Sequence, residues 1–305
     1  MSDLECSRCG NTLGPTARFC LKCGETQEPL SQRLRNALGP EYELLGELGR
    51  GGAAVVFSVR DTARKQYLAV KVMHPELMTS HTVVERFRRE ARYVAQLDHP
   101  NILSVVFSSE KAGLVFYAMP RIGGKTLAKY LDNLGQLPVQ ASLSILGQVA
   151  AGLHHAHAHG VIHRDVKPSN IMIEESGHAL ILDFGVAKAL WGDGVHLSAS
   201  GEVIGSPRYM SAEQASGSKH IDHRTDIYSW GVVAFHMLAG RVPFDDEGVQ
   251  AILYKQMSVE PPDLRALRPD LPKDLTEAIH RCMAKDPARR WENVLDAARA
   301  MGCTV

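Results

Sequence analysis

The local sequence pattern changes from strand-like to helical near Gly123-Gly124. Between about residue 41 and that point, segments rich in Val and aromatic residues alternate with Gly and charged residues, as strands and their turns do. The expected strands are 41–48, 55–60, 67–73, 102–107 and 114–119, with an amphipathic helix at 83–97. After it, the helical period predicts helices at 126–134, 139–159, 222–240, 246–257, 273–284 and 291–301. A strand-rich part followed by a larger helical part predicts a two-lobed α+β fold.

Length and composition are those of ordinary folded proteins. The 305 residues are 45% hydrophobic and 22% charged, and 34 Lys and Arg balance 34 Asp and Glu. This balance disfavours binding to nucleic acid or membranes through bulk charge. No apolar run approaches the roughly 18 residues of a spanning helix, and the polar N-terminus lacks a secretion signal. We therefore expect a soluble cytoplasmic protein.

Four of the six cysteines lie near the N-terminus, as Cys6-x-x-Cys9 and Cys20-x-x-Cys23. A Gly follows each pair and lets the backbone turn sharply around a metal. Four thiolates complete a tetrahedral zinc site with no open position, and the metal would supply the folding energy that so short a segment lacks. We expect a structural zinc ribbon over residues 1–24. Reactive cysteine pairs, a disulfide pair and a rubredoxin-type iron site are the alternatives.

Residues 25–40 are expected to connect the ribbon to the rest of the chain. Ser31 is the predicted cap of a short helix, Gln32–Leu38, which Gly39 ends. Residues 1–36 carry five Lys and Arg against four Asp and Glu, a weak footprint for nucleic acid. A protein-docking or regulatory role for the ribbon is therefore favoured.

A glycine-rich hairpin and a strand lysine follow. The hairpin lies between two expected strands, and its small residues let backbone N–H groups approach phosphate oxygens; it comprises Gly49, Arg50, Gly51, Gly52, Ala53 and Ala54. Lys71 lies in an apolar strand, where a buried ammonium needs a partner. Glu90 on the amphipathic helix can provide one, although a surface pair of Glu90 with Arg86 is the alternative.

A polar loop completes the pattern, with the sequence His163-Arg164-Asp165-Val166-Lys167-Pro168-Ser169-Asn170 and, later, Asp183-Phe184-Gly185. In order and spacing, the hairpin, lysine, glutamate, loop and Asp-Phe-Gly together resemble the protein kinase signature over about 42–301. The segments 47–52 and 209–214 resemble the bacterial branch of serine/threonine kinases. The domains expected are the ribbon 1–24, a linker 25–40, an N-lobe with hinge 41–122 and a C-lobe 123–305.

The resemblance implies an ATP-dependent enzyme that phosphorylates Ser or Thr of proteins. Lys71 would hold the α- and β-phosphates and pair with Glu90, and Asp165 would accept the proton of the substrate hydroxyl. Asn170 and Asp183 would bind Mg²⁺ or Mn²⁺, and Lys167 would stabilise the transferring phosphoryl group. The adenine would meet the hinge and two small strand residues, although the strand residues can also be ordinary core; these are Met119, Pro120, Ile122, Val56 and Ala69.

The resemblance also implies regulation and bracing. Ser198 and Ser200 stand six and four residues before Ile204, where bacterial relatives autophosphorylate, a reaction that can pass through a homodimer; serines without a role are the alternative. The phosphate would neutralise a basic cluster that includes Arg164. Bracing is expected from Asp226 under the catalytic loop and from a pair between Glu213 and Arg290. Ala54 and Ala212 depart from the family's Gly and Pro.

The remaining expectations concern the histidines, the alternative functions and the activating signal. Most rings of the run His154, His155, His157 and His159 are expected on an exposed helix face rather than on a metal, and His163 is expected to pack rather than act as a base. The alternatives to an active kinase are a pseudokinase scaffold that docks partners through the ribbon and a nucleic-acid-binding protein. The chain ends soon after its last predicted helix without a membrane span, so we expect a cytoplasmic signal.

Overall fold

The computed structural model describes residues 4–6, 8–13, 19–24, 28–79, 81–184 and 207–305. Contacts divide the chain into two compact units. The first comprises residues up to Ala95 together with Ser104–Arg121, and the second comprises Gln96–Leu103 together with Ile122–Val305. In the described residues, no helix is long and apolar enough to cross a membrane.

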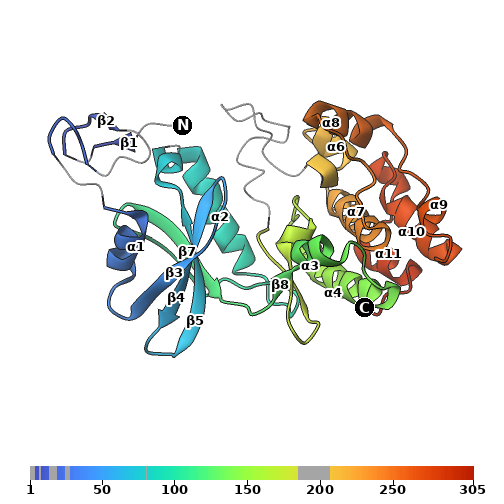
Figure 1. Ribbon diagram of the computed structural model, residues 1–305, viewed down its shortest axis with the longest axis horizontal. Helices are drawn as coiled ribbons and strands as arrows, with labels where there is room; N and C mark the ends of the chain where they lie inside the picture. The colour runs from blue at the N-terminus through green and yellow to red at the C-terminus, as the bar shows by residue number, and fades with distance from the viewer. Residues whose placement is uncertain (1–3, 7, 14–18, 25–27, 80, 185–206) are drawn as a thin grey trace. The chain divides into compact units, whose positions relative to one another are not determined.

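Strands dominate the first unit (Figure 1). A two-stranded hairpin near the N-terminus pairs β1 (Leu4–Glu5) with β2 (Thr12–Leu13). The main sheet is antiparallel, with the order β3-β4-β5-β7-β6. Its strands are β3 (Tyr42–Arg50), β4 (Ala54–Asp61), β5 (Gln66–Met73), β6 (Phe107–Lys111) and β7 (Leu114–Pro120). Its helices are α1 (Leu30–Leu38), the 3₁₀ turn η1 (Pro75–Thr79) and α2 (His81–Val94).

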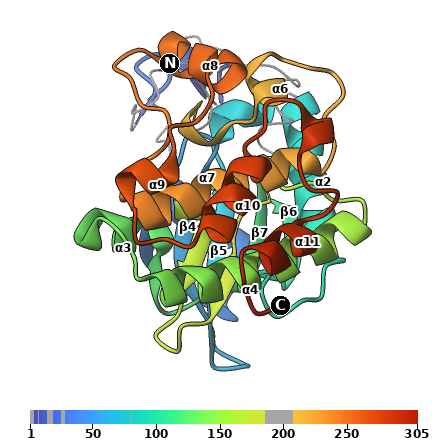
Figure 2. The ribbon, with the colours of Figure 1, turned by 90° about the vertical axis from the view of Figure 1, so that its right-hand side faces the viewer.

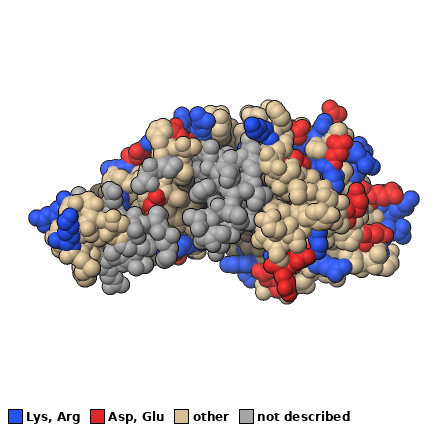
Figure 3. Space-filling model, turned by 90° about the horizontal axis from the view of Figure 1, so that it is seen from above, with Lys and Arg blue, Asp and Glu red and all other residues tan. Residues whose placement is uncertain are grey.

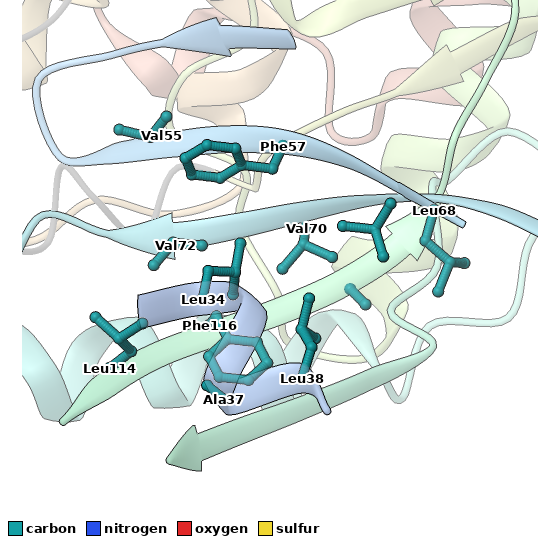
Figure 4. Close-up of a cluster of buried hydrophobic side chains, with 12 residues drawn as sticks. Leu34, Ala37, Leu38, Val55, Phe57, Leu68, Val70, Val72, Leu114 and Phe116 are labelled. Carbon is teal, nitrogen blue, oxygen red and sulfur yellow. The ribbon is translucent and has the colours of Figure 1, made fainter. Parts of the chain in front are cut away.

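Helix α1 covers one face of this sheet rather than simply linking two domains. Leu34, Ala37 and Leu38 pack against the buried side chains of β4, β5 and β7 (Figure 4). The predicted helix start was wrong, because α1 begins at Leu30 after Pro29, and Ser31 lies inside its first turn. Pro29 is the N-cap residue, with φ −56° and ψ 146°, and its side chain makes no capping hydrogen bond.

One predicted strand was misplaced. In the apolar run 102–107, Ile102 forms an isolated bridge and only Phe107 lies in a strand, β6 (Phe107–Lys111). The tight turn at Ala112 and Gly113, both with positive φ, sets the register of β6 against β7. The turn at Ala112 and Gly113 therefore indicates the position of this edge strand better than the apolar run does.

Helices dominate the second unit, as Figure 2 shows. They are α3 (Leu127–Leu134), α4 (Val139–Ala158), α6 (Ala212–Ala215), α7 (Arg224–Ala239), α8 (Val249–Ser258), α9 (Leu264–Leu267), α10 (Lys273–Cys282) and α11 (Val294–Ala300). The 3₁₀ turns are η2 (Pro168–Asn170), η3 (Pro207–Tyr209) and η4 (Pro287–Arg289). A small antiparallel sheet has the order β10-β9-β8, from β8 (Lys125–Thr126), β9 (Ile171–Ile173) and β10 (Ala179–Ile181). Helix α7 forms the centre of the core, since nearly all its side chains are buried.

Candidate active site and metal centre

The four N-terminal cysteines converge. Their sulfur atoms all lie within 4.8 Å of one another, with Cys6 and Cys23 3.5 Å apart and Cys9 and Cys20 3.7 Å apart. Sulfurs bound to one tetrahedral zinc lie about 3.8 Å apart, given bonds of about 2.3 Å. A disulfide would require about 2.05 Å. The four residues therefore fit a tetrahedral metal better than two disulfides.

Backbone turns place these sulfurs. Gly10 and Gly24, both at positive φ, donate their N–H groups to the carbonyls of Cys6 and Cys20 at 2.9 and 2.8 Å. Burial of the Cys20 thiol tends to raise its pKa, but hydrogen bonds from the backbone N–H groups of Cys23 and Lys22 lower that pKa to about 7. A thiol of lower pKa gives up its proton to a metal more readily.

The main sheet presents the predicted nucleotide residues on one face. Val56 is opposite Lys71 in the β4–β5 register, and Ala69 is opposite Met119 in the β5–β7 register. Because side chains alternate between faces, these four share one face. The other face carries the residues that pack on α1. Lys71 also lies 5.7 Å from the ring centroid of Tyr117 on β7.

The glycine-rich hairpin joins β3 to β4. The N–H of Gly51 donates to the carbonyl of Ala54 at 2.9 Å, and the His74 ring bonds the Gly51 carbonyl at 2.8 Å. A side chain added at Gly49 or Gly52 would meet no atom within 4 Å. Because the hairpin is exposed and lacks side chains at these positions, a ligand can approach its backbone closely. Arg50 pairs with Glu47 beside it at 2.7 Å.

The remaining predicted residues of this region are placed only in part. Pro120 ends β7 opposite Leu68, and Ile122 begins the second unit's main segment. Glu90 lies on α2, but its side chain lies outside the described part of the structure, so its pair with Lys71 stays a prediction. Ser198 and Ser200 also lie outside the described residues.

In the second unit, buried Asp226 holds the polar loop 163–170, the predicted catalytic loop. Its two carboxylate oxygens accept hydrogen bonds from the backbone N–H groups of Arg164 at 2.7 Å and His163 at 2.8 Å. The His157 ring lies 2.7 Å from the same carboxylate. Burial tends to raise the pKa of Asp226, but the His157 hydrogen bond and nearby charges hold that pKa below its usual range. The predicted bracing by Asp226 is confirmed.

This contact corrects one prediction about the histidine run. The His157 side chain is only 7% exposed, His154 and His155 are half-buried, and His159 is exposed. Most of these rings are therefore not on an exposed face. The His157 ring, on α4, is buried because it forms a hydrogen bond with the Asp226 carboxylate at the start of α7. In the described residues, the four cysteines are the group whose ligand atoms converge as at a metal site.

His163 supports the loop from within the core. Its Nε2 bonds the Leu182 carbonyl at 3.0 Å, and its Nδ1 accepts the N–H of Asp165 at 3.2 Å. Its ring also contacts that of Phe184, with centroids 4.8 Å apart. Burial lowers the pKa of His163. The neutral ring thus connects the catalytic loop to the Asp-Phe-Gly segment, as its predicted packing role requires.

Three polar residues of the loop, Asp165, Lys167 and Asn170, contact one another. The Lys167 ammonium lies 2.7 Å from a carboxylate oxygen of Asp165. The Asn170 amide nitrogen donates to that oxygen at 3.2 Å and to the Asp165 carbonyl at 2.9 Å. The Asp165 side chain is only 16% exposed, so these contacts fix its direction. The loop therefore presents a positioned carboxylate beside a cation and an amide.

Backbone strain occurs at this centre. Arg164 and Asp183 adopt φ of 62° and 44°, a region that costs non-glycine residues about 1–3 kcal/mol. The Arg164 peptide is held from both sides, because Asp226 accepts its N–H and the Gln214 amide donates to its carbonyl at 2.9 Å. Sequence reasoning missed the role of Gln214. Its place in a Ser-x-x-Gln capping box was the available signal.

Comparison with known proteins identifies the family. The protein kinase domain family matches residues 42–300. The serine/threonine-protein kinase PrkC of Bacillus subtilis is 34% identical over 255 residues, 84% of this chain and 39% of PrkC. The serine/threonine-protein kinase pkn3 of Myxococcus xanthus is 36% identical over 259 residues, 82% of this chain and 47% of pkn3. The crystal structure of the Mycobacterium tuberculosis PknI kinase domain matches with a TM-score of 0.68 and 28% identity, covering 86% of this chain and 96% of that domain.

The antiparallel sheet, the helical unit and the catalytic loop define a protein kinase fold. The chain belongs to the protein kinase family, and these relatives are bacterial serine/threonine-protein kinases. It spans less than half the length of PrkC and of pkn3.

Proposed function

We propose that this chain is an ATP-dependent serine/threonine protein kinase that transfers the γ-phosphoryl group of ATP to protein hydroxyls. The observation that carries the proposal is the Asp165–Lys167–Asn170 centre, held in place by Asp226. The Asp165 carboxylate accepts the proton of the attacking hydroxyl and orients its oxygen. The Lys167 ammonium offsets negative charge on the group being transferred.

The oxygen atoms of this centre fit a hard divalent cation. The nitrogen of the Asn170 amide donates hydrogen bonds to Asp165. The side-chain carbonyl oxygen of Asn170 is therefore the atom that can bind a metal. Together with the Asp183 carboxylate, it would hold Mg²⁺ or Mn²⁺, which prefer oxygen ligands. The metal, when bound with ATP, neutralises phosphate charge. The residues Lys71, Val56, Ala69 and Met119 would receive the nucleotide on the sheet face that they share.

Several finer points belong to the same proposal. A structural Zn²⁺ is supported by the convergence of the four cysteine sulfurs. Autophosphorylation at Ser198 or Ser200, in a transient homodimer, is supported by their spacing from Ile204. We also propose a cytoplasmic location, where cysteines gathered for a metal stay reduced.

Phosphotransfer from labelled ATP tests the proposal directly. The full chain should label itself or a generic protein substrate in the presence of Mg²⁺, and Asp165→Asn should abolish the label. Asp274→Asn changes an exposed carboxylate in the first turn of α10 and should leave labelling unchanged. ATP binding without any transfer by the wild-type chain would instead favour the scaffold alternative.

The zinc site is tested by metal content. The purified chain should carry one Zn²⁺, and Cys6→Ser should lose it. Cys303→Ser, which lies outside the cluster, should retain it. Iron in place of zinc, or a metal-free wild-type chain with cross-linked cysteines, would contradict this assignment.

The charge on one face of the helical unit gives no support to a nucleic-acid-binding function. On the face drawn in Figure 3, Lys and Arg side chains alternate with Asp and Glu over the helical unit. A binding site for a phosphate backbone would instead gather basic side chains on one surface.

A further inference from the structure

The tip of the glycine-rich hairpin is held by hydrogen bonds rather than by side-chain packing. Gly51 and Gly52 are exposed, and a side chain added at Gly52 would meet no atom within 4 Å. The nearby pair of Arg50 with Glu47 lies on β3 and is itself exposed. Because glycine restricts the backbone less than other residues do, such a tip would have to be ordered by its ligand unless another group held it.

His74, directly after β5, supplies two of these hydrogen bonds. Its backbone N–H donates to the Ala53 carbonyl at 3.0 Å, and its ring Nε2 lies 2.8 Å from the Gly51 carbonyl oxygen. Because a carbonyl only accepts, Nε2 carries the proton of this bond. Among the described residues, the Gly51 carbonyl accepts this bond from His74 and none from the Ala54 N–H, which would close an ordinary tight turn. The ring therefore replaces the turn's own hydrogen bond.

The His74 ring is itself held in place. Pro75 follows it, and a residue before proline is restricted to extended backbone conformations. The His74 carbonyl accepts the N–H of Leu77 in η1 at 3.0 Å. The Glu76 carboxylate lies 4.0 Å from the ring Nδ1, and the His74 side chain is only 18% exposed. A fixed residue thus holds an exposed tip.

This hydrogen bond sets the direction of a neighbouring donor. The carbonyl of Gly51 and the N–H of Gly52 belong to one planar trans peptide, so the two groups point in opposite directions. A Gly51 carbonyl that is turned to His74 therefore turns the Gly52 N–H away from His74, and the space beside Gly52 is open. Backbone N–H groups of such turns bind phosphate oxygens. The peptide is therefore arranged for a phosphate before any ligand binds.

We propose that His74 is a positioning residue for ATP, whose ring holds the Gly51–Gly52 peptide so that the Gly52 N–H faces a phosphate oxygen. This role rests on the proposed kinase function. In this role the ring acts through the peptide and not on the reacting atoms. Without the ring, the nucleotide itself has to order the tip, which weakens binding by the contribution of one hydrogen bond, about three- to tenfold.

Binding of Mg-ATP to the full zinc-loaded chain, measured by calorimetry, tests this role. His74→Ala should raise the dissociation constant, and the KM for ATP, about three- to tenfold, while kcat falls by a smaller factor. His74→Gln should restore binding to within about twofold, because its longer amide can donate from near the position of Nε2. His74→Asn carries the same amide on a shorter side chain and should bind as weakly as His74→Ala.

The matched control is His178→Ala. It removes another hydrogen bond between a histidine ring and a carbonyl, that of Pro100 at 2.9 Å in the second unit, and should leave the dissociation constant and KM for ATP unchanged.

Hydrogen exchange of the nucleotide-free chain tests the hold on the hairpin without ATP. The Gly51 amide, bonded to Ala54, should exchange at least about threefold faster in His74→Ala and near the wild-type rate in His74→Gln. If the wild type binds Mg-ATP, then unchanged exchange or unchanged ATP binding in His74→Ala would overturn the positioning role alone. A wild-type chain that neither binds ATP nor transfers its phosphate would overturn the kinase function together with this role.

Discussion

The Arg290 guanidinium forms two hydrogen bonds of 2.7 Å with the Glu213 carboxylate, and its side chain is fully buried. The predicted pair is therefore confirmed. Glu213 lies on α6, while Arg290 follows the 3₁₀ turn η4 near the end of the chain. The pair therefore joins two segments of the helical unit that are far apart in sequence.

Breaking this pair should destabilise the protein. Glu213→Gln leaves the buried Arg290 charge without a counter-charge, and we expect the free energy of unfolding to fall by about 3 kcal/mol. Urea denaturation of the zinc-loaded chain measures this. Glu277→Gln removes one partner of the exposed pair with Lys273 and should cause no measurable change. Equal effects of the two substitutions would show that burial of Arg290 is not the cause.

Helix α1 should contribute to the stability of the kinase domain. Leu34 is fully buried against the sheet, and Leu34→Ala should lower the free energy of unfolding by about 2–5 kcal/mol. Leu134→Ala, at a position 60% exposed, should change it little. Thermal and urea denaturation give both values. A neutral Leu34→Ala would mean that α1 is a free connector in solution.

Lys167 should affect the rate of transfer more than nucleotide binding. Its ammonium contacts Asp165 at 2.7 Å in the loop. Removing one preorganised cation should reduce kcat roughly 100-fold, with little change in KM for ATP. Lys167→Met compared with the exposed Lys273→Met, in steady-state assays, measures this. A change confined to KM would assign Lys167 to nucleotide binding.

Stability should fall on acidification because buried histidines resist protonation. Burial lowers the pKa values of His163, His236 and His280 in the folded protein. The unfolded chain then binds more protons below its ordinary histidine pKa of about 6.5, so the free energy of unfolding decreases as pH falls through that value. The lowered pKa of Asp226 adds a second loss at still lower pH, where its carboxylate becomes protonated.

Urea titrations at pH 7.5 and 5.5, followed by tryptophan emission, measure the histidine effect. His280→Gln should flatten the difference between the two pH values, whereas the exposed His159→Gln should not. Equal stability of the wild-type chain at both values would contradict the assignment of neutral buried histidines.

The sequence predicted the catalytic loop well because its contacts are local. Asp165, Lys167 and Asn170 lie within six residues, so a single turn brings them together. The roles of Asp226 and Glu213 followed only from resemblance to a family. No local pattern indicated that His157 would turn inward to Asp226, because that contact joins α4 to α7 across 69 residues.

The sequence alone determined which chemical groups this protein has and which of them stay close along the chain: four thiolates in two turns, a glycine-rich hairpin and a polar loop. Periodicity determined the type of most elements, because it follows from local geometry. The tertiary structure alone decided which surface α1 buries, where β6 pairs, and that the His74 ring bonds the Gly51 carbonyl. These depend on packing between distant segments, and an apolar stripe shows that a face is buried without showing what buries it.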